Sequence, residues 1–119
     1  MQIDVRFTRL QPSAALAQHA QRRILFALDR FQPQIARVSI RLQDTNGPRG
    51  GVDKSCSVEV ALLQGGTVRL DEIGEDAYAV VDRAAARLRH SVARTLERAH
   101  PRSGPSLATL PLADERKAG

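Results

Sequence analysis

The longest helical pattern in the chain is EDAYAVVDRAAARLRHSVARTLERA, residues 75–99. Apolar side chains recur every three or four residues along it, as they do when one side of a helix packs on a core. Acidic residues stand at its start and arginines near its end, which suits the helix dipole. The expected core positions are Ala77, Val81, Ala84, Ala85, Leu88, Val92, Thr95, Leu96 and Ala99.

Four other segments alternate apolar and polar residues, which is the period of a half-buried strand. They lie at residues 2–8, 37–43, 55–62 and 68–70. The sequence Gln-Gly-Gly at 64–66 predicts a hairpin turn between the last two. Each strand has only one apolar side, so we expect helices on one face of the sheet and solvent on the other.

A second helix is expected over residues 14–31, with Ser13 as its N-cap and Pro33 beyond its end. The order of elements is then β-α-β-β-β-α. The first β-α-β unit gives a parallel pair of strands, and the later hairpins give antiparallel pairs. The predicted fold class is α+β, a two-layer sandwich with a four-stranded mixed sheet and two helices on one face.

The length of 119 residues favours a single domain. We assign residues 1–100 to an α+β domain and residues 101–119, with prolines at 101, 105 and 111, to a flexible C-terminal tail. The N-terminus has no signal-peptide pattern, and no apolar run is long enough for a membrane span. A single cysteine is consistent with a reducing compartment. We therefore expect a cytoplasmic protein with no membrane partner.

The net charge is +5, and 16 of the 18 basic residues are arginine. Five basic side chains of the last helix fall within an arc of roughly 80°. Like charges one turn apart destabilise a helix unless a partner neutralises them, so this stripe favours a phosphate-rich partner. The alternative is an ordinary solvated face in an arginine-rich protein. The stripe comprises Arg83, Arg87, His90, Arg94 and Arg98, and Arg22, Arg23 and Arg30 of the first helix could extend it.

Aromatic residues are scarce, since the chain has three phenylalanines, one tyrosine and no tryptophan. Tyr78 lies on the flank of the core side of its helix and is expected to pack rather than to stack on a base. Recognition of single-stranded bases by stacking is therefore not expected. Shape and phosphate recognition of structured RNA fits the composition better.

No catalytic set or metal site is predicted, and no cofactor or small-molecule substrate is implied. Cys56 falls in the apolar register of its strand, where a buried, inert thiol is expected. The acidic residues Asp71, Glu72, Glu75 and Asp76 could form a metal site, but capping of the following helix is the favoured interpretation. No histidine pair has a zinc spacing with the cysteine.

The stretch DTNGPRGGVDKSC, residues 44–56, is rich in glycine and contains Lys-Ser. It is not a phosphate-binding P-loop, because Asp53 rather than glycine precedes Lys54 and a strand follows. Two interpretations remain. The stretch is either a plain connection or a basic finger formed by Arg49 and Lys54.

The sequence IGEDAYAVVDRAAARLRHSVAR, residues 73–94, resembles the second-helix signature of the ribosome hibernation promoting factor and ribosome-associated inhibitor A family, also known as sigma-54 modulation proteins. The run from Glu75 to Asp82 carries the match. The chain start, with Met1-Gln2-Ile3 and a helix opening near Pro12-Ser13, is also similar. The resemblance covers about residues 1–99 and implies the same element order.

The resemblance implies a stress or stationary-phase factor that binds the 30S subunit of the 70S ribosome. It would contact 16S rRNA in the tRNA and mRNA channel and block translation. The chain resembles a short form, expected to be monomeric off the ribosome. The alternatives are a general structured-RNA-binding module and a small enzyme that uses Cys56 or the acidic residues. The residues at the family's basic helix positions are Arg22, Arg23, Arg87, His90 and Arg94, while Arg83 and Arg98 rest on the stripe alone.

Overall fold

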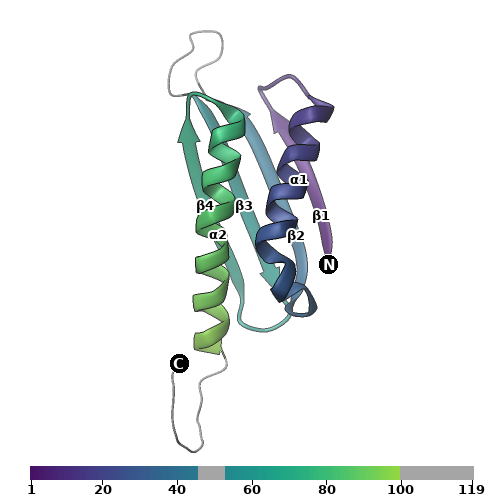
Figure 1. Ribbon diagram of the computed structural model, residues 1–119, viewed down its shortest axis with the longest axis vertical. Coiled ribbons are helices and arrows are strands. Elements are labelled where there is room, and N and C mark those ends of the chain that lie inside the picture. The colour runs from purple at the N-terminus through teal and green to yellow at the C-terminus, as the bar shows by residue number, and fades with distance from the viewer. Residues whose placement is uncertain (46–52, 100–119) are drawn as a thin grey trace, which may run out of the picture.

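The computed structural model describes residues 1–45 and 53–99 as one sheet covered by two helices (Figure 1). The order β-α-β-β-β-α is confirmed. The elements are β1 (Gln2–Thr8), α1 (Ala14–Leu28), a 3-10 helix η1 (Asp29–Gln34), β2 (Ile35–Asp44), β3 (Lys54–Leu62), β4 (Thr67–Gly74) and α2 (Ala77–Ala99).

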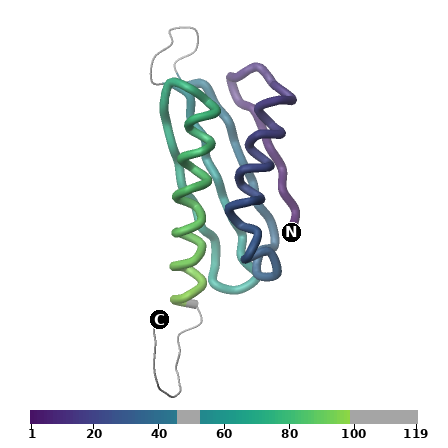
Figure 2. Tube along the Cα trace, viewed as in Figure 1, coloured from purple at the N-terminus to yellow at the C-terminus, as the bar shows by residue number. Residues whose placement is uncertain are grey.

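The sheet has the strand order β1-β2-β3-β4. The pair β1–β2 is parallel, and the pairs β2–β3 and β3–β4 are antiparallel, which confirms the mixed sheet. By this pattern β4 runs in the same direction as β1. Each helix packs back against the strand that precedes it, so α1 and α2 run parallel to each other on the same face (Figures 1 and 2).

The predicted apolar register is confirmed along the sheet and both helices. Side chains at alternate positions of β2, β3 and β4 face the helices. In α2 most of the expected positions are buried, and Val80 is buried in addition, while Ala77 and Thr95 are only partly buried. The apolar residues of β1 are only partly buried, because β1 is an edge strand. The fully buried centre consists of Ala20, Ile24, Leu28, Val38, Ile40, Leu42, Cys56, Val58, Val60, Val80, Val81, Ala84, Leu88 and Val92.

The helix ends differ from the predicted bounds by a few residues. Ser13 caps α1 as expected, since its Oγ accepts a hydrogen bond from the Leu16 amide at 3.1 Å. The α-helix ends at Leu28, and the chain continues as η1 through Pro33. Proline has no N–H to donate to the carbonyl four residues earlier, which favours the tighter 3-10 turn.

The second helix begins at Ala77, two residues later than predicted. Asp76 precedes its first residue. The Asp76 carboxylate accepts a hydrogen bond from the Tyr78 amide at 3.0 Å, and its carbonyl accepts one from the Val80 amide at 2.9 Å. Asp76 therefore satisfies backbone donors at the helix start, which is the capping role favoured from the sequence.

Two arginines of α2 fold over the exposed edge of β4. Arg83 Nη2 donates to the Ile73 carbonyl at 2.9 Å, and Arg87 Nη1 donates to the Asp71 carbonyl at 3.0 Å. Both also contact the carboxylate of Glu72, Arg87 at 2.6 Å and Arg83 at 3.4 Å. The hydrogen bond from Arg87 is the main cause that lowers the pKa of Glu72. These contacts cover an edge that would otherwise be open to another strand.

Gly74 leaves the room that this arrangement needs. A Cβ at this position would lie 2.5 Å from Arg83 Nη2 and 2.9 Å from a methyl carbon of Val80. Both distances are shorter than normal contacts. The glycine before the helix therefore permits the close approach of α2 and Arg83 to the end of β4.

We predict that Leu88→Ala lowers the free energy of unfolding by about 2–5 kcal/mol, because Leu88 is fully buried between α2 and the sheet. The matched control is Leu63→Ala. Leu63 is 64% exposed, so the same truncation should cost less than about 0.5 kcal/mol. Urea unfolding followed by circular dichroism measures both. Equal losses would contradict the packing of α2 described here.

We also predict that Glu72→Gln lowers the free energy of unfolding at pH 7 by at most about 1 kcal/mol, since the arginine partners are half exposed. The pKa of Glu72 is lowered in the folded state, so its ion pairs stabilise the protein above the ordinary value of 4.5. That contribution disappears as the pH falls through the lowered pKa.

The difference between Glu72→Gln and the wild type should therefore shrink toward zero as the pH falls below 4.5 and through the lowered pKa of Glu72. Urea unfolding at a series of pH values measures it. The control is Glu97→Gln on the exposed side of α2, which makes no ion pair with any residue in the described ranges and should track the wild type. A difference for Glu72→Gln that does not vary with pH would contradict the ion-pair interpretation.

Candidate nucleic-acid interface

The two layers of the fold carry different net charges. The helices α1 and α2 contain seven arginines and two acidic residues, a net charge of +5. The four strands contain five basic and five acidic residues, a net charge of zero. The helix layer thus carries a charge equal to that of the whole chain, +5. A polyanion would be attracted to the helix layer more strongly than to the strands.

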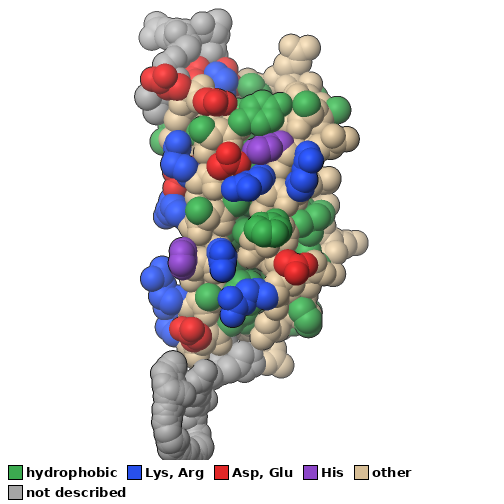
Figure 3. Space-filling model, in the orientation of Figure 1, with side chains coloured by type: hydrophobic (Ala, Val, Ile, Leu, Met, Phe, Trp, Pro, Cys, Tyr) green, Lys and Arg blue, Asp and Glu red, His purple; other side chains and the backbone are tan. Residues whose placement is uncertain are grey.

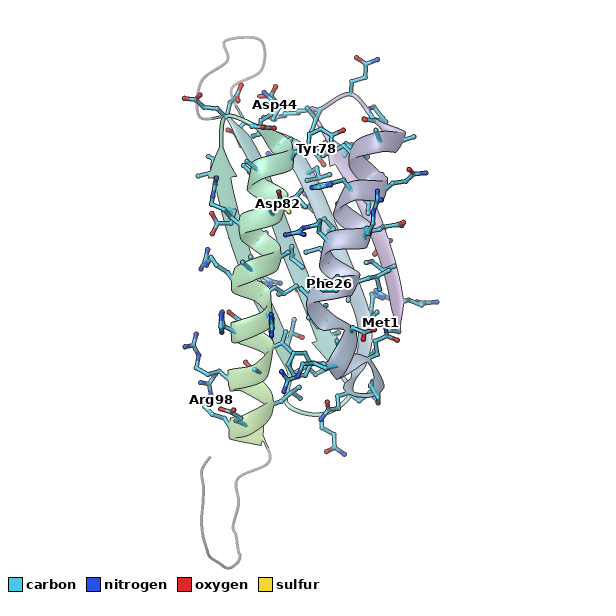
Figure 4. The ribbon with its side chains drawn as sticks, viewed as in Figure 1. Met1, Phe26, Asp44, Tyr78, Asp82 and Arg98 are labelled. Carbon is cyan, nitrogen blue, oxygen red and sulfur yellow. The ribbon has the colours of Figure 1, made fainter. Side chains whose placement is uncertain are left out.

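The predicted stripe on α2, which we call the edge stripe, consists of Arg83, Arg87, His90, Arg94 and Arg98. Its first two members are the arginines that cover β4, and each is still about half exposed. The other three are exposed and form no ion pair within residues 1–45 and 53–99. Figure 4 shows Arg98 at the end of α2 remote from Asp44. The stripe therefore combines two anchored arginines with three unpaired basic side chains.

A second group of arginines lies on and between the helices. We call Arg22, Arg23, Arg30 and Arg89 the helix-face cluster. Arg22 and Arg89 are exposed and have no ion pair with the described part of the chain. The Arg30 guanidinium lies 5.3 Å from the centre of the Phe31 ring, within range of a cation–π contact. Figure 3 shows basic side chains along both helices on this face.

Asp82 of α2 links the two helices. Its Oδ1 lies 2.8 Å from Nε2 of His19 and 3.1 Å from Nε of Arg23, both on α1 (Figure 4). The Tyr78 ring meets the His19 ring edge to face, with centroids 5.0 Å apart. Arg23 is therefore turned toward α2 and connects the α1 arginines with those of α2.

Sequence reasoning missed Arg89 as a member of the site. Arg89 lies on the flank of α2 opposite the edge stripe. It projects from the helix in nearly the same direction as Asp82, which stands two turns earlier. Only the position of α1 beside that flank makes it part of a shared surface. A helical wheel of α2 alone shows the direction in which Arg89 projects, but it does not show that α1 lies on that side.

Two aromatic side chains are exposed, contrary to the expectation of a surface with almost no stacking groups. Phe26 of α1 is 78% exposed, and Tyr78 is 41% exposed, although it was expected to pack. Figure 4 labels Phe26 on α1 and Tyr78 near the start of α2. The signal in the sequence was that Phe26 stands one turn from both Arg22 and Arg30, which places it on the polar side of the helix.

Of the two loop residues in the predicted site, the structure describes Lys54. Arg49 lies outside the described residues. Lys54 is the first residue of β3, and its Nζ lies 2.9 Å from Asp53 and 3.6 Å from Asp44. The hydrogen bond to Asp53, a buried carboxylate, is the main cause that raises the pKa of Lys54. The charge of Lys54 is balanced locally, and a basic finger at this loop stays a prediction.

The structure also describes the thiol that was considered as a reactive group. Cys56 is buried, as predicted, and burial raises the pKa of its thiol to about 12. The thiol is then protonated at neutral pH and is a poor nucleophile. Within residues 1–45 and 53–99, no group of three or more histidine, cysteine or acidic side chains could hold a metal ion.

Neither of the helices described is long and apolar enough to cross a membrane.

Comparison with known proteins identifies the family. The family model described as Sigma 54 modulation protein / S30EA ribosomal protein matches residues 3–100. The N-terminal domain of Thermus thermophilus Protein Y superposes with a TM-score of 0.66 at 26% identity, over 79% of this chain and 98% of that chain. No curated protein matches the sequence.

A ribosomal subunit interface protein from Coxiella burnetii shares the fold, with a TM-score of 0.65 at 20% identity, over 79% of this chain and 96% of that chain. The resemblance read from the second helix is confirmed by the family match, which extends from β1 to the end of α2. The chain belongs to the Sigma 54 modulation protein / S30EA ribosomal protein family.

Proposed function

We propose that this protein is a ribosome-associated translation inhibitor that binds the small ribosomal subunit through its helix layer. The observation that carries the proposal is the separation of charge, with +5 on the two helices and zero on the four strands. Family membership supports the ribosome as the polyanion, since the family description includes a ribosomal protein.

The partner surface we propose is 16S rRNA. Arginine presents a planar fork of donors that matches phosphate oxygens, and structured RNA is recognised largely by its shape and its phosphates. From Arg83 to Arg98 the edge stripe extends about 22 Å along α2, which is long enough to follow several phosphates. The helix-face cluster widens this surface across to α1.

Inhibition would follow from occupancy rather than from chemistry. We propose that the protein occupies the tRNA and mRNA channel of the 30S subunit, under stress or in stationary phase, and excludes the substrates of translation. This mode of action requires no cofactor, metal ion or small-molecule substrate. It requires only a rigid, positively charged surface, which the two packed helices provide.

We predict that the double variant Arg22→Glu plus Arg94→Glu loses association with 30S subunits, because it reverses one exposed charge on each helix. The matched control is Arg37→Glu plus Arg41→Glu, which reverses the same number of exposed arginines on the open face of the sheet. The control should bind like the wild type. Cosedimentation of purified 30S subunits with each protein in sucrose gradients measures the association.

The dependence on salt gives a second readout. Each phosphate contact contributes a slope of roughly 0.7–0.9 to the fall of log K with log salt. If the variant Arg22→Glu plus Arg94→Glu still binds measurably, its slope of log K against log salt should be shallower than that of the wild type by about 1.5. Failure of the wild type to bind 30S subunits, or equal loss in both variants, would overturn the proposal. Equal affinity for 30S subunits and for an arbitrary RNA duplex would instead favour a general structured-RNA-binding module.

A further inference from the structure

Phe26 is the most exposed large apolar side chain in the described part of the chain, at 78%. A single exposed apolar residue is common on protein surfaces and needs no explanation by itself. The surroundings of Phe26 are unusual, because it stands on the layer that carries the net positive charge.

Arginines border Phe26 along its own helix. Arg22 precedes it by one turn of α1, so the two side chains project from the same side of that helix. Arg30 follows in η1, and its guanidinium lies 5.3 Å from the centre of the Phe31 ring. Arg23 also precedes it by about one turn and points toward α2, where it contacts Asp82 at 3.1 Å. Two arginines therefore precede Phe26 on α1, and Asp29 and Arg30, whose charges are opposite, follow it in η1.

A further arginine lies on α2, on the flank directed toward α1. The contact of 2.8 Å between His19 and Asp82 fixes the relative level of α1 and α2. The two helices run in the same direction. A step of two turns, about seven residues, along each helix from this contact therefore ends at the same level on both. That step leads from His19 to Phe26 and from Asp82 to Arg89. Phe26 and Arg89 therefore lie at the same level of the two helices, each on the flank directed toward the other helix.

We infer that Phe26 is a stacking platform for an unpaired nucleobase of the RNA whose phosphates the helix-face cluster binds. A nucleotide offers a flat apolar base next to an anionic phosphate. The protein offers an exposed apolar ring on a helix that also carries Arg22 and Arg23, with Arg89 at the same level of α2. Stacking on an aromatic side chain with nearby arginines is a recurrent way of holding unpaired bases. The inference rests on the proposed function and adds a base-binding position to it.

A protein partner fits this site less well. Anchor residues of protein interfaces are enclosed by further contacts that exclude water. The other exposed large apolar residues lie elsewhere: Met1 at the chain start, Leu63 in the turn after β3, Ile73 on β4 and Tyr78 at the start of α2. The neighbours of Phe26 on the surface are instead charged groups, which suit a nucleotide.

The test uses variants that separate aromatic from merely apolar character. Phe26→Ala and Phe26→Leu should both weaken binding to purified 30S subunits, by roughly five- to a hundred-fold, the range of a lost base stack. Phe26→Tyr and Phe26→Trp should bind within about twofold of the wild type, since each retains a stacking ring. Leu63→Ala is the control for removal of an exposed apolar side chain and should bind like the wild type.

A photoreactive phenylalanine analogue at position 26 provides an independent readout. Irradiation of its complex with purified 30S subunits should cross-link the protein to 16S rRNA, and the same analogue at position 63 should give far less product. Full affinity in Phe26→Leu, or cross-linking of position 26 to a ribosomal protein alone, would overturn the inference. If the wild type binds and every variant at position 26 binds equally, the inference fails while the proposed function stands. If the wild type does not bind, both fail.

Discussion

The burial of Val81, Leu88 and Val92 against the sheet is the contact on which the rest of the surface depends. These side chains fix the rotation of α2 about its axis, because turning the helix would bring charged groups into the core at a cost of several kcal/mol. Once this side of α2 faces the sheet, the surroundings of its other sides are determined as well. One flank faces the edge of β4, the other faces α1, and the outer side faces solvent.

The flank toward β4 gives two arginines a double role. Arg83 and Arg87 satisfy backbone carbonyls at the sheet edge and share the Glu72 carboxylate, and they still present charge to solvent. Glu72 offsets the repulsion between them. No such acid opposes His90, Arg94 and Arg98 within the described ranges. Like-charged neighbours one turn apart cost a few tenths of a kcal/mol each, and a phosphate partner would remove that cost.

The flank toward α1 holds the helices together despite their like charges. Asp82 accepts contacts from His19 and Arg23, so one carboxylate offsets part of the repulsion between the arginines of the two helices. The same contact sets the level of α1 against α2 and thereby places Phe26 opposite Arg89. A structural ion pair thus determines the geometry of the surface that we propose for RNA, while the sheet, whose four strands together carry no net charge, provides a scaffold for it.

Much of the fold could be predicted because it depends on local periodicity. Alternation of apolar side chains at Val38, Ile40 and Leu42 follows from the two-residue repeat of a strand, and the spacing in α2 follows from 3.6 residues per turn. These repeats also predicted that both helices cover one face. The bounds of the helices were less well predicted, because Asp76 and Pro33 act on individual backbone hydrogen bonds rather than on a repeating pattern.

The sequence by itself determined which residues form the core side of each element and that basic residues line the other side of α2. It did not determine which of those basic residues form ion pairs within the protein. That Glu72 holds Arg87, that Asp82 reaches Arg23, and that Phe26 stays exposed at the level of Arg89 were decided only by the tertiary structure. The physical reason is that these arrangements depend on the relative rotation and level of elements far apart in the chain, which side-chain packing sets and no local repeat encodes.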